Sequence, residues 1–409
     1  MIKSITSVKV TGRRVIIRAG FDVPLEKNIQ TEQWQVADDT RIRDILPTLN
    51  YLIEQKAKII IMAHLGRPEG WQTEKSLWPV AEKLGELIDY SVTKVSDKLP
   101  DYAVAHVNFL TSDITKRDYS RLSQTVEPGS ILFLENLRFY KGEEANETKF
   151  INLLAGFGDV YVNDAFSAAH RKESSTFGLA AKLPHYAGVD FLKEIQSLNK
   201  IIKNPRPPLI VLIGGAKIAD KVPTIANLAK YAQAVLIGGA TANAFLKAKG
   251  YEIGKSKVTD VILAKDLLRQ YKDKIILPID VVVAGDLESK PRLVAVDKVM
   301  PNDLILDIGP ESIRKFSEII REAKTLVWNG PFGLIEKPRY AFGSKSIAHI
   351  FATRSKGSAF GVIGGGETIE VVDQAKVAEY IDHVSMGGGA MLEFLAGTKL
   401  PAIKALEEK

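Results

Sequence analysis

The stretch PLIVLIGGAKIADK (208–221) decides the fold class of this chain. A continuous apolar run, residues 209–213, ends directly in two glycines, and a segment with helical periodicity follows. Apolar runs of this kind are typical of strands that are buried on both faces in parallel sheets covered by helices. The stretch therefore predicts a strand, a glycine-rich loop and a helix, which together form one repeating unit of an α/β protein.

The same pattern occurs in both halves of the chain. In the first half it covers RRVIIRAGFDVP (13–24), AKIIIMAHLGRP (57–68), SILFLENLRF (130–139) and VYVNDAFSAAHR (160–171). In the second half it returns in AVLIGGATANAFL (234–246), KIILPIDVVV (274–283), TLVWNGPFGLIE (325–336) and AFGVIGGGETIEVV (359–372). Parallel sheets of this class bind ligands outside the carboxyl ends of their strands, so we expect these loops to line the functional face of each half.

Composition narrows the class of protein. The 409 residues are too many for one ordinary domain and suit two, and the hydrophobic fraction of 45% is that of a globular protein. The lack of cysteine excludes disulfides and cysteine metal sites and suits a cytoplasmic location. We expect no signal peptide, because MIKSITSVKV (1–10) lacks an apolar core followed by a small-residue cleavage site. We expect no membrane association, because no apolar run reaches roughly 18 to 20 residues. The net charge of +6 without basic runs favours a small anionic substrate over nucleic acid.

The loops of the two halves differ in chemistry. Those of the first half are basic and carry Arg18, Arg41, His64, Arg67, Arg138, His170 and Arg171. Those of the second half are rich in glycine and carry Lys217 and Lys221. Between them, a helical segment through Lys203 is stopped by prolines at 205, 207 and 208. We therefore predict a first domain over 1–187 and a second over 188–397, which includes a linking helix over 188–203.

Single motifs in this chain are weak evidence, and two are decoys. GYEIGKS (250–256) has one residue too few between its glycines for a phosphate-binding P-loop, and GFGDVY (156–161) lacks the last glycine of a dinucleotide fingerprint. A single motif such as HLGRP, ENLRF or GGAK is better explained as a turn with a solvated charge than as a binding site. Because a basic residue or a glycine group follows nearly every strand, we interpret the set as an anion site in one half and a nucleotide site in the other.

Ten stretches, taken together and in this order, resemble the phosphoglycerate kinase family. They are ADDTRIRDILPTL, HLGRP, LFLENLRFY, YVNDAFSAAHR, GGAKIADK, LPIDVVV, DIGPES, VWNGPFGLIE, GGGET and HVSMGGGAMLEFLAG, and the match runs from about Arg13 to Pro401. The resemblance implies two doubly wound parallel-sheet (Rossmann-like) domains joined by a helical hinge, with residues 398–409 returning to the N-terminal domain. It also implies a monomer that transfers a phosphoryl group reversibly between ATP and the carboxylate of 3-phosphoglycerate, with Mg²⁺, to give 1,3-bisphosphoglycerate and ADP.

The resemblance also implies site residues. The 3-phosphoglycerate site would comprise Asp22, Arg41, His64, Leu65, Gly66, Arg67, Arg138, His170 and Arg171. The nucleotide site would comprise Gly214, Gly215, Ala216, Lys217, Lys221, Gly239, Asn329, Pro331, Glu336, Gly365, Gly366, Glu367 and Thr368, with Glu367 holding the metal. The catalytic groups would be Arg41, Lys217, Gly365 and Gly388. The acceptor is an ionised carboxylate, so no general base is needed, and catalysis depends on positioning and charge neutralisation.

The chain departs from the family pattern in four places. GFD (20–22) stands where a D-x-N triplet is usual, and we hypothesise that Asp22 replaces the lost carboxylate while Gly20 leaves room. Glu367 replaces the usual Asp and would shift the metal or its water shell. Met386 and Met391 replace small residues around the glycine triplet, so side-chain contacts to phosphate would be lost, while the backbone donors of 387–389 would still form an anion cradle.

A second hypothesis follows from these departures. The chain could be a catalytically impaired relative that serves as a nucleotide- or nucleic-acid-binding regulatory protein. The retention of Arg41, Lys217, Arg67, Arg138 and Arg171 favours the enzyme.

Overall fold

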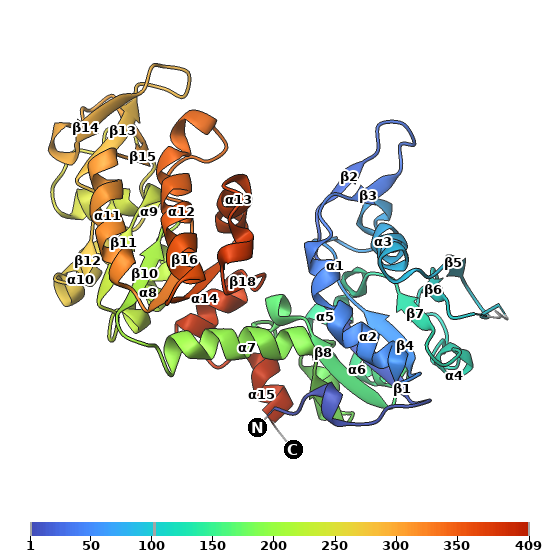
Figure 1. Ribbon diagram of the computed structural model, residues 1–409. Helices are drawn as coiled ribbons and strands as arrows, with labels where there is room; N and C mark the ends of the chain where they lie inside the picture. Colours follow the sequence, from blue (N-terminus) through green and yellow to red (C-terminus); the bar gives the residue numbers. More distant parts are fainter. Residues whose placement is uncertain (1, 101–103, 408–409) are drawn as a thin grey trace. The chain divides into compact units, whose positions relative to one another are not determined.

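A computed structural model describes residues 2–100 and 104–407 of the chain. These residues form two compact units. Unit 1 comprises the chain up to Ile195 together with the segment from Lys399 onward, and unit 2 comprises Gln196–Thr398. The division falls within helix α7 (Val189–Ile202), which occupies the segment predicted to form the linking helix (Figure 1).

Unit 1 is built on a seven-stranded sheet in the order β5-β6-β7-β4-β1-β8-β9, in which all neighbouring strands are parallel. In chain order the strands are β1 (Arg14–Ala19), β4 (Lys58–Met62), β5 (Val92–Val95), β6 (Val107–Leu110), β7 (Ile131–Leu134), β8 (Val160–Asp164) and β9 (His185–Ala187). Helices α2 (Leu46–Glu54), α3 (Trp78–Ile88) and α6 (Thr148–Ala155) accompany this sheet. The carboxyl ends of β7, β4, β1 and β8 therefore lie side by side at one edge.

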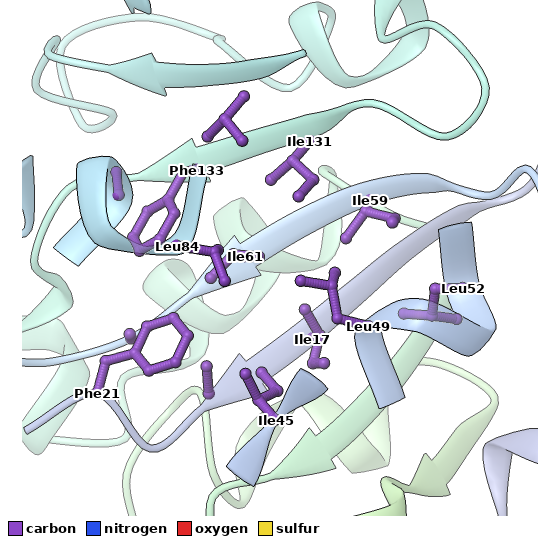
Figure 2. Packing of buried hydrophobic residues seen from close by; sticks show 14 of the residues in the cluster. Ile17, Phe21, Ile45, Leu49, Leu52, Ile59, Ile61, Leu84, Ile131 and Phe133 are labelled. Carbon is purple, nitrogen blue, oxygen red and sulfur yellow. The ribbon is translucent and has the colours of Figure 1, made fainter. Parts of the chain in front are cut away.

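The core of unit 1 explains why the apolar runs form strands. Ile17 of β1 pairs in register with Ile61 of β4, and both are fully buried. Figure 2 shows these side chains in one cluster with Leu49 and Leu52 of α2. Burying both faces of the central strands removes their apolar surface from water, which is the main favourable contribution to folding. The packed core thereby provides a rigid base for the loops at the strand ends.

Unit 2 has a six-stranded parallel sheet in the order β12-β11-β10-β16-β17-β18. The strands are β10 (Leu209–Ile213), β11 (Ala234–Ile237), β12 (Ile275–Ile276), β16 (Thr325–Asn329), β17 (Phe360–Gly364) and β18 (His383–Ser385). Counted along the chain, this is the order 3-2-1-4-5-6 of a doubly wound sheet, whose topological switch point lies between β10 and β16. The opening stretch PLIVLIGG thus supplies the strand at the switch point.

One predicted strand is only partly correct. The run KIILPIDVVV divides into β12, which joins the parallel sheet, and β13 (Asp280–Ala284), which does not. Strand β13 is the centre of a separate antiparallel sheet with β14 (Arg292–Ala295) and β15 (Leu304–Ile308). Pro278 lies between the two parts and has no N–H to donate to a sheet, so one strand cannot continue through it. The α/β fold class is confirmed, with this small sheet added to unit 2.

The remaining elements are short or cover the sheets. Unit 2 contains α8 (Val222–Leu228), α9 (Gly239–Ala248), α10 (Val261–Tyr271), α11 (Pro310–Glu322), α12 (Phe342–Lys356), α13 (Gly366–Gln374) and α14 (Gly389–Leu395). Unit 1 contains β2 (Leu25–Lys27), β3 (Trp34–Val36), α1 (Thr40–Asp44), α4 (Leu122–Thr125), α5 (Lys141–Glu144) and the 3₁₀ helices η3 (Leu137–Phe139), η4 (Phe166–Ala168) and η5 (Gly178–Ala181). Within the described ranges, no helix has the length and apolar character needed to cross a membrane.

The C-terminal segment belongs to unit 1. Helix α15 (Pro401–Glu407) contacts η5 and β9, and the N–H of Ala402 donates a hydrogen bond of 3.1 Å to the carbonyl of Ala169. Ala402, Ala405 and Leu406 are buried. The last two residues of the segment predicted to return to the first domain, 408–409, lie outside the described residues.

Candidate active site

Basic side chains gather at the carboxyl edge of the sheet in unit 1. The members of this basic cluster come from four neighbouring strands and the elements that follow them: Arg18 from β1, Arg41 from α1, His64 after β4, Arg138 from η3, and His170 and Arg171 after η4. The order β7-β4-β1-β8 places these strand ends next to one another. A shared edge thus unites residues that are far apart in the sequence.

Arg138 is held by two strong hydrogen bonds. One of its terminal nitrogens donates to the carbonyl of Gly66 at 2.7 Å, and the other donates to Oε1 of Glu173 at 2.8 Å. Glu173 is buried and also lies 3.5 Å from a guanidinium nitrogen of Arg171. Charge-assisted bonds of this type fix the plane of the guanidinium group. Nε of Arg138 is buried and makes no hydrogen bond in the described part of the chain.

His64 and Asp22 face each other across the cluster. Nε2 of His64 lies 4.0 Å from Oδ2 of Asp22, and Oδ1 of Asp22 accepts a hydrogen bond of 2.8 Å from the N–H of Gly66. Arg41 donates to the backbone carbonyl of Asp22 at 2.6 Å. Burial, followed by the nearby charges of Arg18 and Arg138, holds the pKa of His64 well below its ordinary value, so the ring is neutral at pH 7.

The other predicted substrate-binding residues lie in the same place but differ in exposure. Arg67 is exposed and forms no ion pair with any described residue, so its side chain is available to a ligand. Leu65 is buried, and its N–H donates to Oδ1 of Asn136 at 3.2 Å. His170 lies beside Arg171, with Nε2 at 3.5 Å from Nε of the arginine.

The predicted nucleotide residues surround the switch point of unit 2. The N–H of Gly214 donates to the carbonyl of Asn329 at 2.9 Å, which links the end of β10 to the end of β16. Nδ2 of Asn329 donates to the carbonyl of Gly364 at 2.7 Å, and Oγ1 of Thr368 accepts from the N–H of Gly330 at 2.7 Å. Asn329 and Thr368 are both buried. These bonds hold three glycine loops in one fixed arrangement.

Glycine is required where these loops touch. A Cβ atom on Gly214 would lie 2.1 Å from the carbonyl oxygen of Pro331. Gly239 has φ +59°, and a Cβ there would lie 2.5 Å from the same oxygen. The N–H of Gly215, at φ +77°, donates to this carbonyl at 2.7 Å. Both the close approach and the left-handed backbone exclude other residues.

Two charged side chains converge on Gly215. A Cβ built on this glycine would lie 2.7 Å from Nζ of Lys221 and 3.4 Å from Oε2 of Glu367. Lys221 is buried and donates to the carbonyl of Gly214. Burial lowers the pKa of Lys221, and the charge of Glu367 acts in the opposite direction. Lys217, by contrast, is exposed.

A pocket of about 480 Å³ opens beside these loops within unit 2. The predicted residues Gly215, Ala216, Gly239, Pro331, Glu336 and Glu367 line one part of it. The other wall is apolar and comes largely from β13 and β15, with Val281, Leu304 and Leu306. Sequence reasoning did not assign this wall to the nucleotide site because its residues look like ordinary core residues, although LPIDVVV, which contains Val281, and DIGPES were both singled out. An apolar slot beside glycine loops suits a flat base attached to phosphates.

The glycine triplet after β18 forms a turn into α14. Gly388 has φ +51°, and the N–H of Gly387 donates to Oγ of Ser385 at 3.2 Å. Met391 is fully buried, and its sulfur occupies the space next to Gly364, 2.1 Å from where a Cβ of that glycine would lie. Met391 is therefore a core residue that supports the end of β17. Met386 is half-buried in the turn itself.

Among the residues that the structure describes, His, Asp and Glu side chains form no group of three that could hold a metal ion. The predicted metal ligand Glu367 lies in the first turn of α13, next to Gly215.

The sequence and the fold both match known proteins. The model of the phosphoglycerate kinase family matches residues 5–398. The phosphoglycerate kinase of Pelotomaculum thermopropionicum is 41% identical to this chain, and the match covers 100% of this chain and 99% of the relative. The phosphoglycerate kinase of Chloroflexus aggregans is 42% identical, and the match covers 99% of each chain. The solved phosphoglycerate kinase structure from Coxiella burnetii has a TM-score of 0.83 at 33% identity over 100% of this chain and 99% of that one. That from Pyrococcus horikoshii has a TM-score of 0.82 at 28% identity, covering 99% and 98%. This chain belongs to the phosphoglycerate kinase family.

Proposed function

We propose that the chain transfers a phosphoryl group reversibly between ATP and the carboxylate of 3-phosphoglycerate, giving ADP and 1,3-bisphosphoglycerate. The observation that carries the proposal is the pairing of two sites of complementary chemistry, each at the carboxyl edge of its own parallel sheet. The basic cluster suits a small, doubly anionic acceptor, and the glycine-lined pocket suits a nucleotide. Transfer needs the two ligands in line, so we expect domain closure during turnover.

On the acceptor side, the basic cluster would bind by charge and geometry. Guanidinium forks match phosphate oxygens, so Arg67, Arg138 and Arg171 would hold the remote phosphate, with His64 and His170 beside them. Arg41 would brace the carboxylate and the transferring group. Asp22 would accept the hydrogen bond of the substrate hydroxyl, and its attachment to the N–H of Gly66 supports this role by fixing its orientation. The acceptor carboxylate is ionised at neutral pH and needs no base.

On the donor side, backbone groups and two lysines would bind the nucleotide. Lys217 would contact the transferring phosphoryl and Lys221 the phosphates, while Glu336 would contact the ribose at the mouth of the pocket. The N–H groups of Gly365 and Gly388 would stabilise charge on the transferring group. The remaining predicted contacts are Gly214, Gly215, Ala216, Gly239, Asn329, Pro331, Gly366 and Thr368.

Magnesium would be held jointly by Glu367 and the nucleotide phosphates. Mg²⁺ is commonly bound through one or two carboxylates together with substrate phosphates, and it demands near-octahedral oxygen geometry. The longer side chain of glutamate reaches toward Gly215, where the phosphates would lie. A monomeric state and a cytoplasmic location belong to the same proposal.

A coupled assay tests the proposal. The protein is supplied with 1,3-bisphosphoglycerate, ADP and Mg²⁺, and ATP is measured. We expect rapid ATP formation by the wild type and a severe loss in Lys217→Ala, because an exposed cation aimed at the transferring group would be removed. The regulatory alternative would be supported if the wild type formed ATP no faster than Lys217→Ala and also bound generic DNA or RNA in a salt-sensitive manner.

A further inference from the structure

We infer that a buried chain of three side chains fixes the protonation site of His64, so that the ring presents its Nε2–H to the bound substrate. The three are Arg18, Ser175 and Glu143. They act as positioning residues behind His64, which is the residue proposed to touch the substrate. The inference rests on the proposed function for the identity of the ligand, but its structural part is independent of activity.

The contact between Arg18 and His64 settles which ring nitrogen accepts. A terminal nitrogen of Arg18 lies 2.6 Å from Nδ1 of His64, and both side chains are buried. A guanidinium group has only donors and stays protonated in proteins. Nδ1 must therefore be an unprotonated acceptor, and a neutral imidazole then carries its proton on Nε2.

The surroundings of His64 keep the ring neutral. Burial disfavours a charged ring, and the charges of Arg18, Arg138, Arg41 and His170 oppose a further positive charge there. Asp22 is the carboxylate near the ring, but its Oδ2 lies 4.0 Å from Nε2, beyond hydrogen-bond distance. Within the described part of the chain, the Nε2–H thus has no acceptor and is available to an anionic oxygen.

Arg18 is itself held by a support that reaches into the core. Its Nε donates to Oγ of Ser175 at 2.7 Å, and Nη1 donates to the carbonyl of Ala19. The Ser175 hydroxyl donates to Oε1 of Glu143, and the Ser175 N–H donates to Oε2 at 3.1 Å. Because the hydroxyl proton is committed to Glu143, a serine lone pair faces Arg18. Each group therefore orients the next, from Glu143 through to His64.

This arrangement has a consequence for binding a phosphate or carboxylate. With Nε2–H toward the substrate, His64 donates a hydrogen bond without adding a fourth positive charge to three buried or half-buried arginines. If the support is lost, the Nδ1–H tautomer becomes accessible and turns a lone pair toward the substrate oxygen. Such a contact between two acceptors is repulsive and weakens binding.

The test is ¹⁵N NMR of the histidine side chains in the full-length protein at pH 7, with His64 assigned by its loss in His64→Gln. We expect a protonated Nε2 and an acceptor-type Nδ1 in the wild type. This measurement is made on the wild-type protein and does not depend on turnover. A proton on Nδ1, or a doubly protonated ring, would overturn the inference.

A matched pair of variants tests the support. Ser175→Ala removes the hydroxyl between Arg18 and Glu143, whereas Ser174→Ala removes a neighbouring buried hydroxyl that donates to the carbonyl of Gly142 at 2.8 Å. We expect mixed tautomers of His64 and a KM for 3-phosphoglycerate raised about tenfold in Ser175→Ala, with the KM for ATP unchanged. The wild-type tautomer and KM should persist in Ser174→Ala. Equal behaviour of the two variants would show that the hydroxyl of Ser175 does not position Arg18.

A wild type with the expected tautomer but no ATP formation would reject the proposed function while leaving the positioning chain intact.

Discussion

The basic cluster of unit 1 and the nucleotide pocket of unit 2 lie at equivalent edges of two parallel sheets, yet they are made of different parts. The basic cluster uses long charged side chains, several of which are held by buried partners, as Arg138 is by Glu173. The pocket uses main-chain atoms that approach each other so closely that glycine is required, as at Gly214 against Pro331. The first site depends mainly on side-chain chemistry, whereas the loops of the second also need positions that carry no side chain.

The difference follows from what each site has to recognise. A small anion offers only oxygen atoms, so charge and bidentate geometry must provide the binding free energy. A nucleotide offers a large flat base and a long phosphate chain, so an apolar slot and close backbone N–H groups can bind it together with a few charged side chains. Substitutions should therefore have graded, ligand-specific effects in the basic cluster and all-or-none effects in the glycine loops.

Gly214→Ala should have the largest effect. The added Cβ would lie 2.1 Å from the carbonyl of Pro331, so the ends of β10 and β16 must separate. We expect a loss of about 1–3 kcal/mol in the free energy of unfolding and no measurable ADP binding by calorimetry. Gly285→Ala is the control, since the nearest atom to its Cβ is 3.9 Å away. Wild-type ADP affinity in Gly214→Ala would show that the loops can move apart without cost.

Arg138→Lys should have a large effect on one substrate. A lysine ammonium cannot donate to both Gly66 and Glu173 in the fixed fork geometry of arginine. We expect the KM for 3-phosphoglycerate to rise at least about tenfold and the KM for ATP to stay within about twofold. Arg14→Lys makes the same change at an arginine that pairs with Asp159 at the amino end of β1. If both variants raised the KM for 3-phosphoglycerate equally, the effect would not be specific to the cluster.

The sequence predicted the fold class because the central strands, such as β1, β4, β7 and β8 of unit 1, are apolar runs followed by a loop with functional residues, whereas β5, β6 and β9 were not predicted. It did not predict that Pro278 divides one run between two sheets, since strand pairing depends on residues far apart in the chain. Arg18 shows the limit for the site. It was recognised as a basic residue near a loop, but its burial and its contact with His64 depend on β4, β8 and the segment at Ser175. The apolar wall with Val281 was missed for the same reason.

Glu367→Ala should alter the response to metal. The carboxylate lies near Gly215 and Lys221, where it would share Mg²⁺ with the nucleotide phosphates. We expect the Mg²⁺ concentration for half-maximal activity to rise several-fold, which corresponds to a loss of about 1 kcal/mol in the free energy of metal binding. The measurement is an activity titration with Mg²⁺ and, in parallel, with Mn²⁺. Identical titration curves for the variant and the wild type would remove Glu367 from the metal site.

Carboxylates with raised pKa values add a second contrast between the units. Burial and the charge of Asp164 raise the pKa of Asp190, in the first turn of α7, to about 9. Burial also raises the pKa of Asp307 in unit 2, to about 7, but the other groups that act on this carboxylate are backbone N–H donors, which lower its pKa. Because folding favours protonated Asp190, its contribution to stability is present below pH 4 and is lost as the pH rises toward 9.

Asp190→Asn should therefore raise the melting temperature at high pH. By calorimetry, we expect the melting temperature to rise at pH 8.5 by about 2–4 °C for each kcal/mol recovered in the free energy of unfolding. At pH 4 we expect no rise. Asp286→Asn is the control, since hydrogen bonds from Ser289 and Glu288 lower the pKa of that exposed carboxylate. A gain for Asp190→Asn that is equal at both pH values would mean that the carboxylate does not titrate in this range.

Met386→Thr should have the smallest effect and is the most direct test of a backbone-built site. Met386 is half-buried in the turn that leads to the glycine triplet, whereas the neighbouring replacement Met391 is fully buried against Gly364. If the N–H groups of the triplet bind phosphate, the side chain at 386 is secondary, and a threonine hydroxyl can only add a donor. We therefore expect kcat in the coupled assay to stay the same or rise by no more than a few-fold. The matched variant Met391→Thr should instead lower stability by about 2 kcal/mol or more, because it leaves a cavity and a buried hydroxyl under β17. A severe fall in kcat for Met386→Thr would mean that the side chain, and not the backbone, shapes this turn, and the contrast between the two units would then fail at this loop.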